Sequence, residues 1–104
     1  MGEFDRQLDG DVLTKREVET KEPPMYKVIL LNDDYTTMEF VIMILEQVFK
    51  RSPEDARSIM LSVHERGAGV AGIYTKEIAE TKIATVHHHA IQNEFPLKCT
   101  MEAS

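Results

Sequence analysis

The 104-residue sequence predicts an α+β domain in which a three-stranded antiparallel sheet packs with three helices. Short apolar runs bounded by Pro, Gly or Asn-Asp alternate with longer segments of helical periodicity. The predicted order is β-α-α-β-α-β. The composition, with 42% hydrophobic and 29% charged residues, is typical of a folded domain.

The first 24 residues differ from the rest. They are charged, contain few large apolar side chains and end in Glu22-Pro23-Pro24, and a Pro-Pro pair favours an extended connector. We therefore predict a flexible N-terminal extension over residues 1–24 and one core domain over residues 25–104.

The core begins with an apolar, β-branched run from Met25 to Leu31, which predicts a strand that ends at Asn-Asp. Thr36 then has the character of a helix N-cap, and Glu39 would complete a capping box with it. Helical spacing of the apolar residues extends this helix through Phe49. Its predicted buried positions are Phe40, Val41, Ile44, Leu45 and Val48.

A second helix start follows at Ser52-Pro53-Glu54-Asp55, which supplies a cap, a proline at the first helical position and acids in the first turn. Gly67 is the expected end of this helix. Its apolar stripe consists of Ala56, Ile59, Met60 and Val63.

The last three elements follow a Gly-Ala-Gly turn. Val70 to Tyr74 predicts a short strand, and a third helix is expected from Thr75 to about Asn93. Pro96 ends that helix, and the alternating segment from Leu97 to Met101 predicts a half-buried strand. The predicted buried side of the third helix is Ile78, Ala79, Ile83, Val86, Ala90 and Ile91.

The bulk properties exclude several classes of protein. A net charge of −6 without clustered Lys and Arg argues against a nucleic-acid partner. No apolar run reaches the length of a membrane span, and the acidic N-terminus is unlike a signal or transit peptide. The single cysteine, Cys99, rules out an internal disulfide and fits a reducing compartment. We expect a cytoplasmic monomer.

Two adjacent acids stand where the first strand ends, in Asn32-Asp33-Asp34. Asn and Asp bond to their own backbone in turns, so this segment predicts a strand-to-helix turn. Its carboxylate and amide oxygens would also accept hydrogen bonds from an ammonium group, which predicts a cation site. The residues by themselves leave both interpretations open.

His64 lies on the apolar stripe of the second helix, near its end. It is either a structural histidine or a hydrogen-bonding group at the rim of an apolar pocket. Met38, Met43 and Met60 could line such a pocket or belong to the core. A hydrolase that binds a metal through Asp33, Asp34 and His64 is a weak alternative, because the sequence offers no nucleophile or standard metal spacing.

The run His87-His88-His89 invites a metal interpretation. Consecutive positions on a helix point about 100° apart, so three neighbours do not face one ion. We predict no metal site and no cofactor.

Three segments in this order resemble the ClpS adaptor family, which delivers substrates to the AAA+ partner of the ClpP protease: PMYKVILLNDDYTTMEFV, IMLSVHERGAGVAGIYTKEIAETKIA and FPLKCTME. The resemblance covers nearly all of residues 24–102. It implies a non-enzymatic adaptor that binds proteins beginning with Leu, Phe, Tyr or Trp and hands them to a ClpA-type unfoldase. The remaining alternative is a general interaction domain that does not require a free α-amine.

The resemblance also implies roles for individual residues. Asn32, Asp33 and His64 would recognise the α-amino group of the substrate, and Asp34 and Tyr35 would form the rim. Met38 would act as a gatekeeper against β-branched first residues. The pocket for the first side chain would consist of Thr36, Met38, Val41, Met60, Val63 and Leu97.

Docking on the N-terminal domain of the unfoldase is implied for Glu77, Glu80 and Lys82, and the N-terminal extension would engage the unfoldase during hand-off. Two features depart from the family pattern. Thr37 stands where the family commonly has Pro, which we expect to loosen the first helical turn and alter specificity. The triple histidine is not a family motif.

Overall fold

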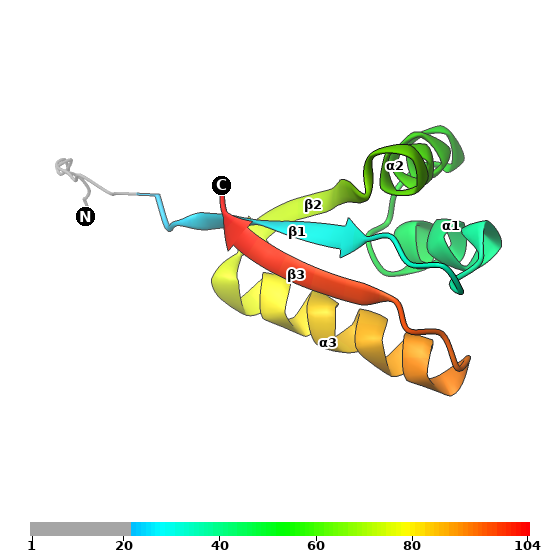
Figure 1. The fold of residues 1–104 in the computed structure, drawn as a ribbon. Helices are drawn as coiled ribbons and strands as arrows, with labels where there is room; N and C mark the ends of the chain where they lie inside the picture. The colour runs from blue at the N-terminus through cyan, green and yellow to red at the C-terminus, as the bar shows by residue number, and fades with distance from the viewer. Residues whose placement is uncertain (1–21) are drawn as a thin grey trace, which may run out of the picture.

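A computed structural model describes residues 22–104, so almost all of the predicted extension lies outside the described residues. The described chain contains six elements in the predicted order (Figure 1). They are β1 (Met25–Leu31), α1 (Met38–Gln47), α2 (Pro53–Arg66), β2 (Ala68–Thr75), α3 (Lys76–Gln92) and β3 (Lys98–Ala103). The predicted α+β class and element order are confirmed.

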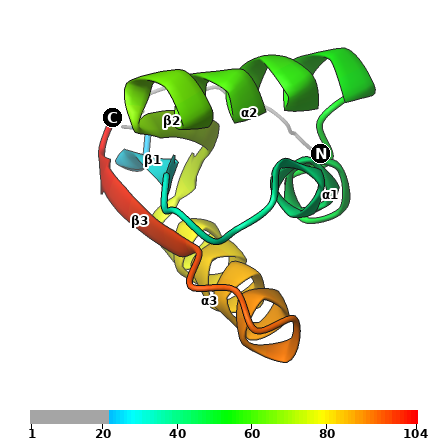
Figure 2. The ribbon, with the colours of Figure 1, turned by 45° about the vertical axis from the view of Figure 1, so that its right-hand side comes forward.

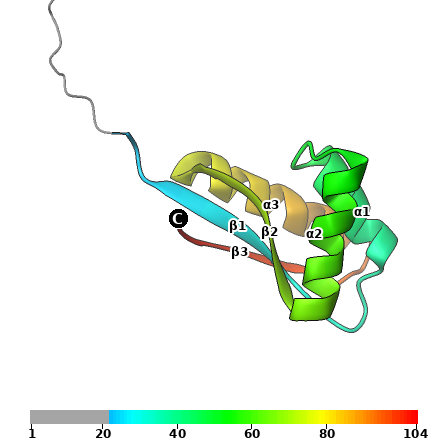
Figure 3. The same cartoon turned by 90° about the horizontal axis from the view of Figure 1, so that it is seen from above.

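The three strands form one antiparallel sheet in the order β2-β1-β3. Ile29 in β1 pairs with Val70 in β2 and with Thr100 in β3, which fixes the register. Helix α3 lies along one face of the sheet, whereas α1 and α2 lie at the end where β1 stops (Figures 1 and 2). Seen from above, α2 and α1 run side by side across this end (Figure 3).

The core forms where alternate strand residues meet the helices. Val28 and Leu30 in β1 are fully buried, as are Ile44 and Leu45 in α1 and Val86 in α3. Burying side chains of this size stabilises the fold by about 1.5–3 kcal/mol each. The predicted stripe of α1 is therefore confirmed at every position.

The predicted stripe of α3 is wrong at two positions. Ile78 is 48% exposed and Ile91 is 75% exposed. The helix contacts the sheet through the small and β-branched side chains of Ala79, Val86 and Ala90. Each isoleucine is adjacent in sequence to one of these alanines, so it points about 100° away from the packed face.

The caps of α2 are those predicted. The Ser52 hydroxyl accepts a hydrogen bond from the Asp55 N–H, and Gly67 ends the helix in the left-handed conformation at φ 89°. The short strand predicted from Val70 to Tyr74 extends one residue further, to Thr75, and begins at Ala68. The last strand begins at Lys98 rather than Leu97.

The predicted cap of α1 is wrong by one residue. Thr37 is the N-cap, and its hydroxyl accepts a hydrogen bond from the Phe40 N–H at 3.1 Å. Thr36 instead donates its hydroxyl to the Asp33 carboxylate, so it does not form the predicted capping box with Glu39. Thr37 precedes the first helical position, and its side-chain cap stabilises the first turn rather than loosening it.

No helix within residues 22–104 is both long and apolar enough to cross a membrane.

Candidate functional site

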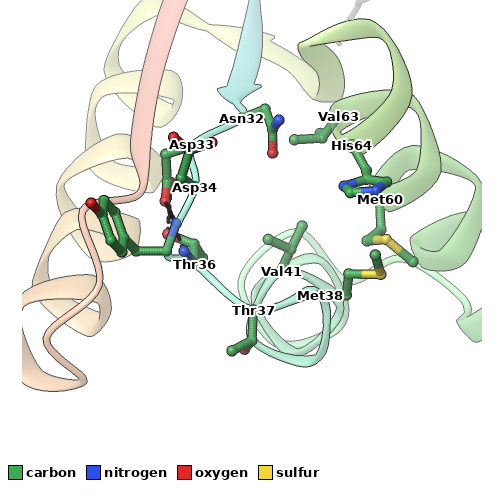
Figure 4. Close-up of a pocket in the computed structure, with 11 residues that line it drawn as sticks. Asn32, Asp33, Asp34, Thr36, Thr37, Met38, Val41, Met60, Val63 and His64 are labelled. Atoms are coloured by element: carbon green, nitrogen blue, oxygen red, sulfur yellow. Dashed lines mark hydrogen bonds between the residues drawn. The ribbon is translucent and has the colours of Figure 1, made fainter.

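A cavity of about 430 Å³ opens between the 32–37 loop, the start of α1 and the C-terminal half of α2 (Figure 4). We call it the cup. It is lined by Asn32, Asp33, Asp34, Tyr35, Thr36, Thr37, Met38, Val41, Met60, Val63 and His64. The structure thus brings together all but one of the residues predicted for amine and side-chain binding.

The floor and one wall of the cup are apolar. Val41, Met60 and Val63 are also part of the hydrophobic core, with exposures of 5%, 7% and 3%. Their positions are therefore fixed by packing. Met38 is 45% exposed at the first residue of α1, and its side chain reaches toward Met60 across the mouth of the cup (Figure 4). A flexible thioether at the mouth can adapt to the outline of a bound side chain.

The opposite wall contains Asp33, whose carboxylate is used within the loop. Oδ1 accepts hydrogen bonds from the N–H groups of Tyr35 and Thr36, and Oδ2 accepts one from the Thr36 hydroxyl, at 2.7–2.8 Å. Burial by itself would raise the pKa of Asp33, but these bonds together lower the pKa below its usual value of 3.8. Asp33 therefore builds the turn that the sequence predicts.

Asp34 differs from its neighbour because its carboxylate is exposed and makes no hydrogen bond within the described part of the chain. Asn32, also exposed, contributes an amide to the same rim, and its backbone N–H donates to the Gly67 carbonyl at 3.0 Å. This bond joins the loop to the C-terminal end of α2. The two walls of the cup are thus connected.

His64 projects from α2 on the side of the cup that faces the acids (Figure 4). Its side chain is exposed, so the interpretation as a buried structural histidine is wrong. Thr37 also lines the cup, although the sequence analysis did not include it among the pocket residues. A hydroxyl residue three positions before a buried helical phenylalanine was the available signal for its place.

Leu97 does not line the cup. It is 4% exposed in the core and borders a separate groove along the end of α3 and the start of β3. Tyr35, at the outer edge of the cup, is 76% exposed.

The predicted docking residues lie on α3, away from the cup. Glu77 and Lys82 border a shared hollow between α3 and the end of α1, whereas Glu80 lies outside it. Lys82 donates its ammonium to the Val48 carbonyl at 2.7 Å and lies 5.6 Å from the Tyr74 ring centroid. It therefore stabilises the end of α1 in addition to any role at the surface.

The remaining candidates offer no catalytic chemistry. The His87 ring accepts a hydrogen bond from the Cys99 N–H, so it points away from its two histidine neighbours. Within residues 22–104, no group of three His, Cys, Asp or Glu side chains is arranged to hold a metal ion. Burial raises the pKa of the Cys99 thiol to about 12, which leaves it protonated and unreactive at neutral pH.

Comparison with known proteins identifies the family. The family model described as "ATP-dependent Clp protease adaptor protein ClpS" matches residues 21–100. The chain belongs to the ClpS family. A ClpS adapter from Desulfatibacillum aliphaticivorans is 60% identical over 89% of both chains. One from Desulfotalea psychrophila is 56% identical over 89% of this chain and 91% of its own.

A solved structure is also similar. ClpS2 of Agrobacterium tumefaciens, bound to L-phenylalaninamide, is 40% identical and superposes with a TM-score of 0.76, over 80% of this chain and 100% of that one. ClpS proteins are adaptors of a protease, not enzymes, so the metal-dependent hydrolase is rejected.

Proposed function

We propose that this protein binds the first residue of proteins that begin with Leu, Phe, Tyr or Trp and delivers them to a ClpA-type AAA+ unfoldase for degradation by ClpP. The observation that carries the proposal is the composition of the cup. It combines a core-packed apolar floor with an exposed carboxylate and amide at one rim. The phenylalaninamide bound by the similar ClpS2 has the matching pair of groups, an aromatic side chain and a free α-amine.

The energetics of the cup suit a ligand of one residue. Burying one Leu or Phe side chain contributes about 1.5–3 kcal/mol. An α-amino group, with a pKa near 7.7–8.0, is largely cationic at neutral pH, and each charge-assisted hydrogen bond to it adds roughly 1.5–3 kcal/mol. After the costs of association, a dissociation constant on the order of micromolar follows, and neither half of the ligand suffices without the other.

We revise the role of the two acids on structural grounds. Both oxygens of Asp33 already accept hydrogen bonds from the loop, so it is better suited to hold the turn than to bind an ammonium group. The free carboxylate of Asp34 is the stronger candidate for the direct charge partner. Asn32 and His64 retain their proposed contacts to the amine, made directly or through water.

The mouth of the cup supports a gatekeeper role for Met38. Its position at the first turn of α1 places the thioether where the Cβ substituents of a bound first residue would arrive. A second branch at Cβ would then press on the Met38 side chain, whereas Leu and Phe branch further along and reach the floor.

Delivery would use surfaces away from the cup. We propose Glu77, Glu80 and Lys82 on α3 for docking on the N-terminal domain of the unfoldase. Residues 1–24, almost all outside the described residues, are proposed to engage the unfoldase during hand-off. Such a role places the protein in the cytoplasm with its ATP-dependent partner.

The proposal is tested by fluorescence anisotropy with a labelled peptide that begins with Phe and its N-acetylated form. Acetylation removes the charge and leaves the side chain intact. We expect micromolar binding of the free peptide and at least tenfold weaker binding of the acetylated one. Equal affinities would refute the proposal and would favour a general interaction domain.

A further inference from the structure

A second hollow, of about 500 Å³, lies on the outer side of the loop that forms the acidic wall of the cup. Residues 32–35 line both cavities, so the loop is a shared partition. The far side of the second hollow is formed by Leu31, Pro96 and Lys98, at the end of β1 and the start of β3. We call it the outer hollow.

We propose that the outer hollow receives the side chain of the second residue of a bound substrate, and that Lys98 selects an acidic side chain there against a basic one. This inference rests on the proposed function of the cup.

The path of the substrate chain supports this assignment. With the first side chain in the cup and its ammonium group at Asn32 and Asp34, the chain must leave across the loop. Consecutive Cα atoms are 3.8 Å apart, and consecutive side chains of an extended chain point to opposite sides. The second side chain therefore points away from the cup. The cavity that continues past the same loop is the outer hollow.

The walls of the outer hollow define what fits. The Tyr35 ring is 76% exposed, and Pro96 is also exposed, which leaves two flat apolar surfaces unpartnered. Lys98 pairs with Leu31 across the β1–β3 ladder, so its side chain stands on the same face of the sheet as Leu31. A side chain with an apolar stem and a terminal charge could contact all three.

The charges of the occupied site decide the sign. The Asp33 carboxylate is bonded within the turn, and the Asp34 carboxylate would be paired with the substrate ammonium. Lys98 is exposed and forms no ion pair with any residue in 22–104. Its charge is therefore the one in the outer hollow that remains uncompensated, and a glutamate at position two would pair with it.

The test compares three peptides that begin Phe-Glu, Phe-Lys and Phe-Ala on the full chain and on Lys98→Glu. Lys76→Glu is the matched control, because it makes the same charge change at the exposed start of α3, away from the loop. We expect Lys98→Glu to lower the ratio of Phe-Glu to Phe-Lys affinity about three- to tenfold at 50 mM salt, and less at 0.5 M. The control should change the ratio by less than twofold.

The outcomes separate this inference from the proposed function. Failure of Phe-Ala to bind the unaltered protein would overturn both. Normal binding of Phe-Ala with an unchanged ratio in Lys98→Glu, or the same change in Lys76→Glu, would overturn the outer hollow alone. A larger effect of Lys98→Glu on peptides that carry the charge at position three would overturn its assignment to the second residue.

Discussion

Replacing Asp34 by Asn should weaken the binding of a Phe-starting peptide without changing the stability of the protein. The substitution keeps the size of the side chain and an acceptor oxygen but removes the charge opposite the ammonium group. A hydrogen bond to a charged group contributes about 1.5–3 kcal/mol. Asp34 is exposed, so solvent screening places the loss nearer about 1–2 kcal/mol, or roughly 5- to 30-fold in Kd.

Asp33 provides the contrast. Asp33→Ala leaves the N–H groups of Tyr35 and Thr36 and the Thr36 hydroxyl without their acceptor. We expect the unfolding free energy to fall by about 1–2 kcal/mol, and binding to fall because the loop loses its shape. Asp33→Asn retains one acceptor oxygen and should lie between Asp33→Ala and the unaltered protein in both measurements.

Anisotropy titration and chemical denaturation, carried out on the same three variants, check these expectations. A loss of binding in Asp33→Asn at full stability, with Asp34→Asn unaffected, would show that Asp33 is the direct ligand and would refute our assignment. The pH dependence gives an independent check. Because the pKa of Asp33 is lowered in the folded state, its carboxylate stabilises the fold above about pH 4, and this contribution disappears as the pH falls through that lowered pKa.

Four further predictions concern the gate, the backbone and the extension. Met38→Ala should improve the affinity for Ile- and Val-starting peptides relative to Leu, measured as a ratio of Kd values; an unchanged ratio would exclude a gate. Gly67→Ala should lower the unfolding free energy by about 1–2 kcal/mol, because an L side chain is strained at φ 89°. Lys50, at φ 57°, is the reverse case, and Lys50→Gly should raise thermal stability by a few degrees if the left-handed strain dominates. Deleting residues 1–20 should leave peptide binding intact and impair degradation of a Phe-starting reporter by the unfoldase–protease pair; lost peptide binding would place the extension within the binding domain.

Local signals predicted much of the fold. Ser52 with Pro53, and Gly67 fourteen residues later, delimit α2 because their backbone preferences act within one turn of chain. Thr36 and Thr37 show the limit of such signals. Either residue can cap a helix, and the choice falls to Thr37 because the Asp33 carboxylate binds the Thr36 hydroxyl. That competition depends on the folded turn and cannot be predicted from composition.

The candidate site was predicted in outline, because its apolar residues recur at helical spacing and its polar residues are adjacent in the chain. The division of labour between Asp33 and Asp34 required coordinates, since a pattern of two acids does not say which one points into the turn. Leu97 was misplaced for a similar reason. Its alternation with Cys99 predicts burial correctly, but not which cavity lies beside it.

The central claim is that the cup binds a first residue through its side chain and its free α-amine together. The most direct test is an NMR titration of the isotopically labelled protein with L-phenylalaninamide and with its N-acetylated form. We predict saturable shift changes of backbone amides in residues 32–38 and 60–64 with the free amine only. Equal changes with both ligands, or changes confined to α3 and β3, would contradict the account.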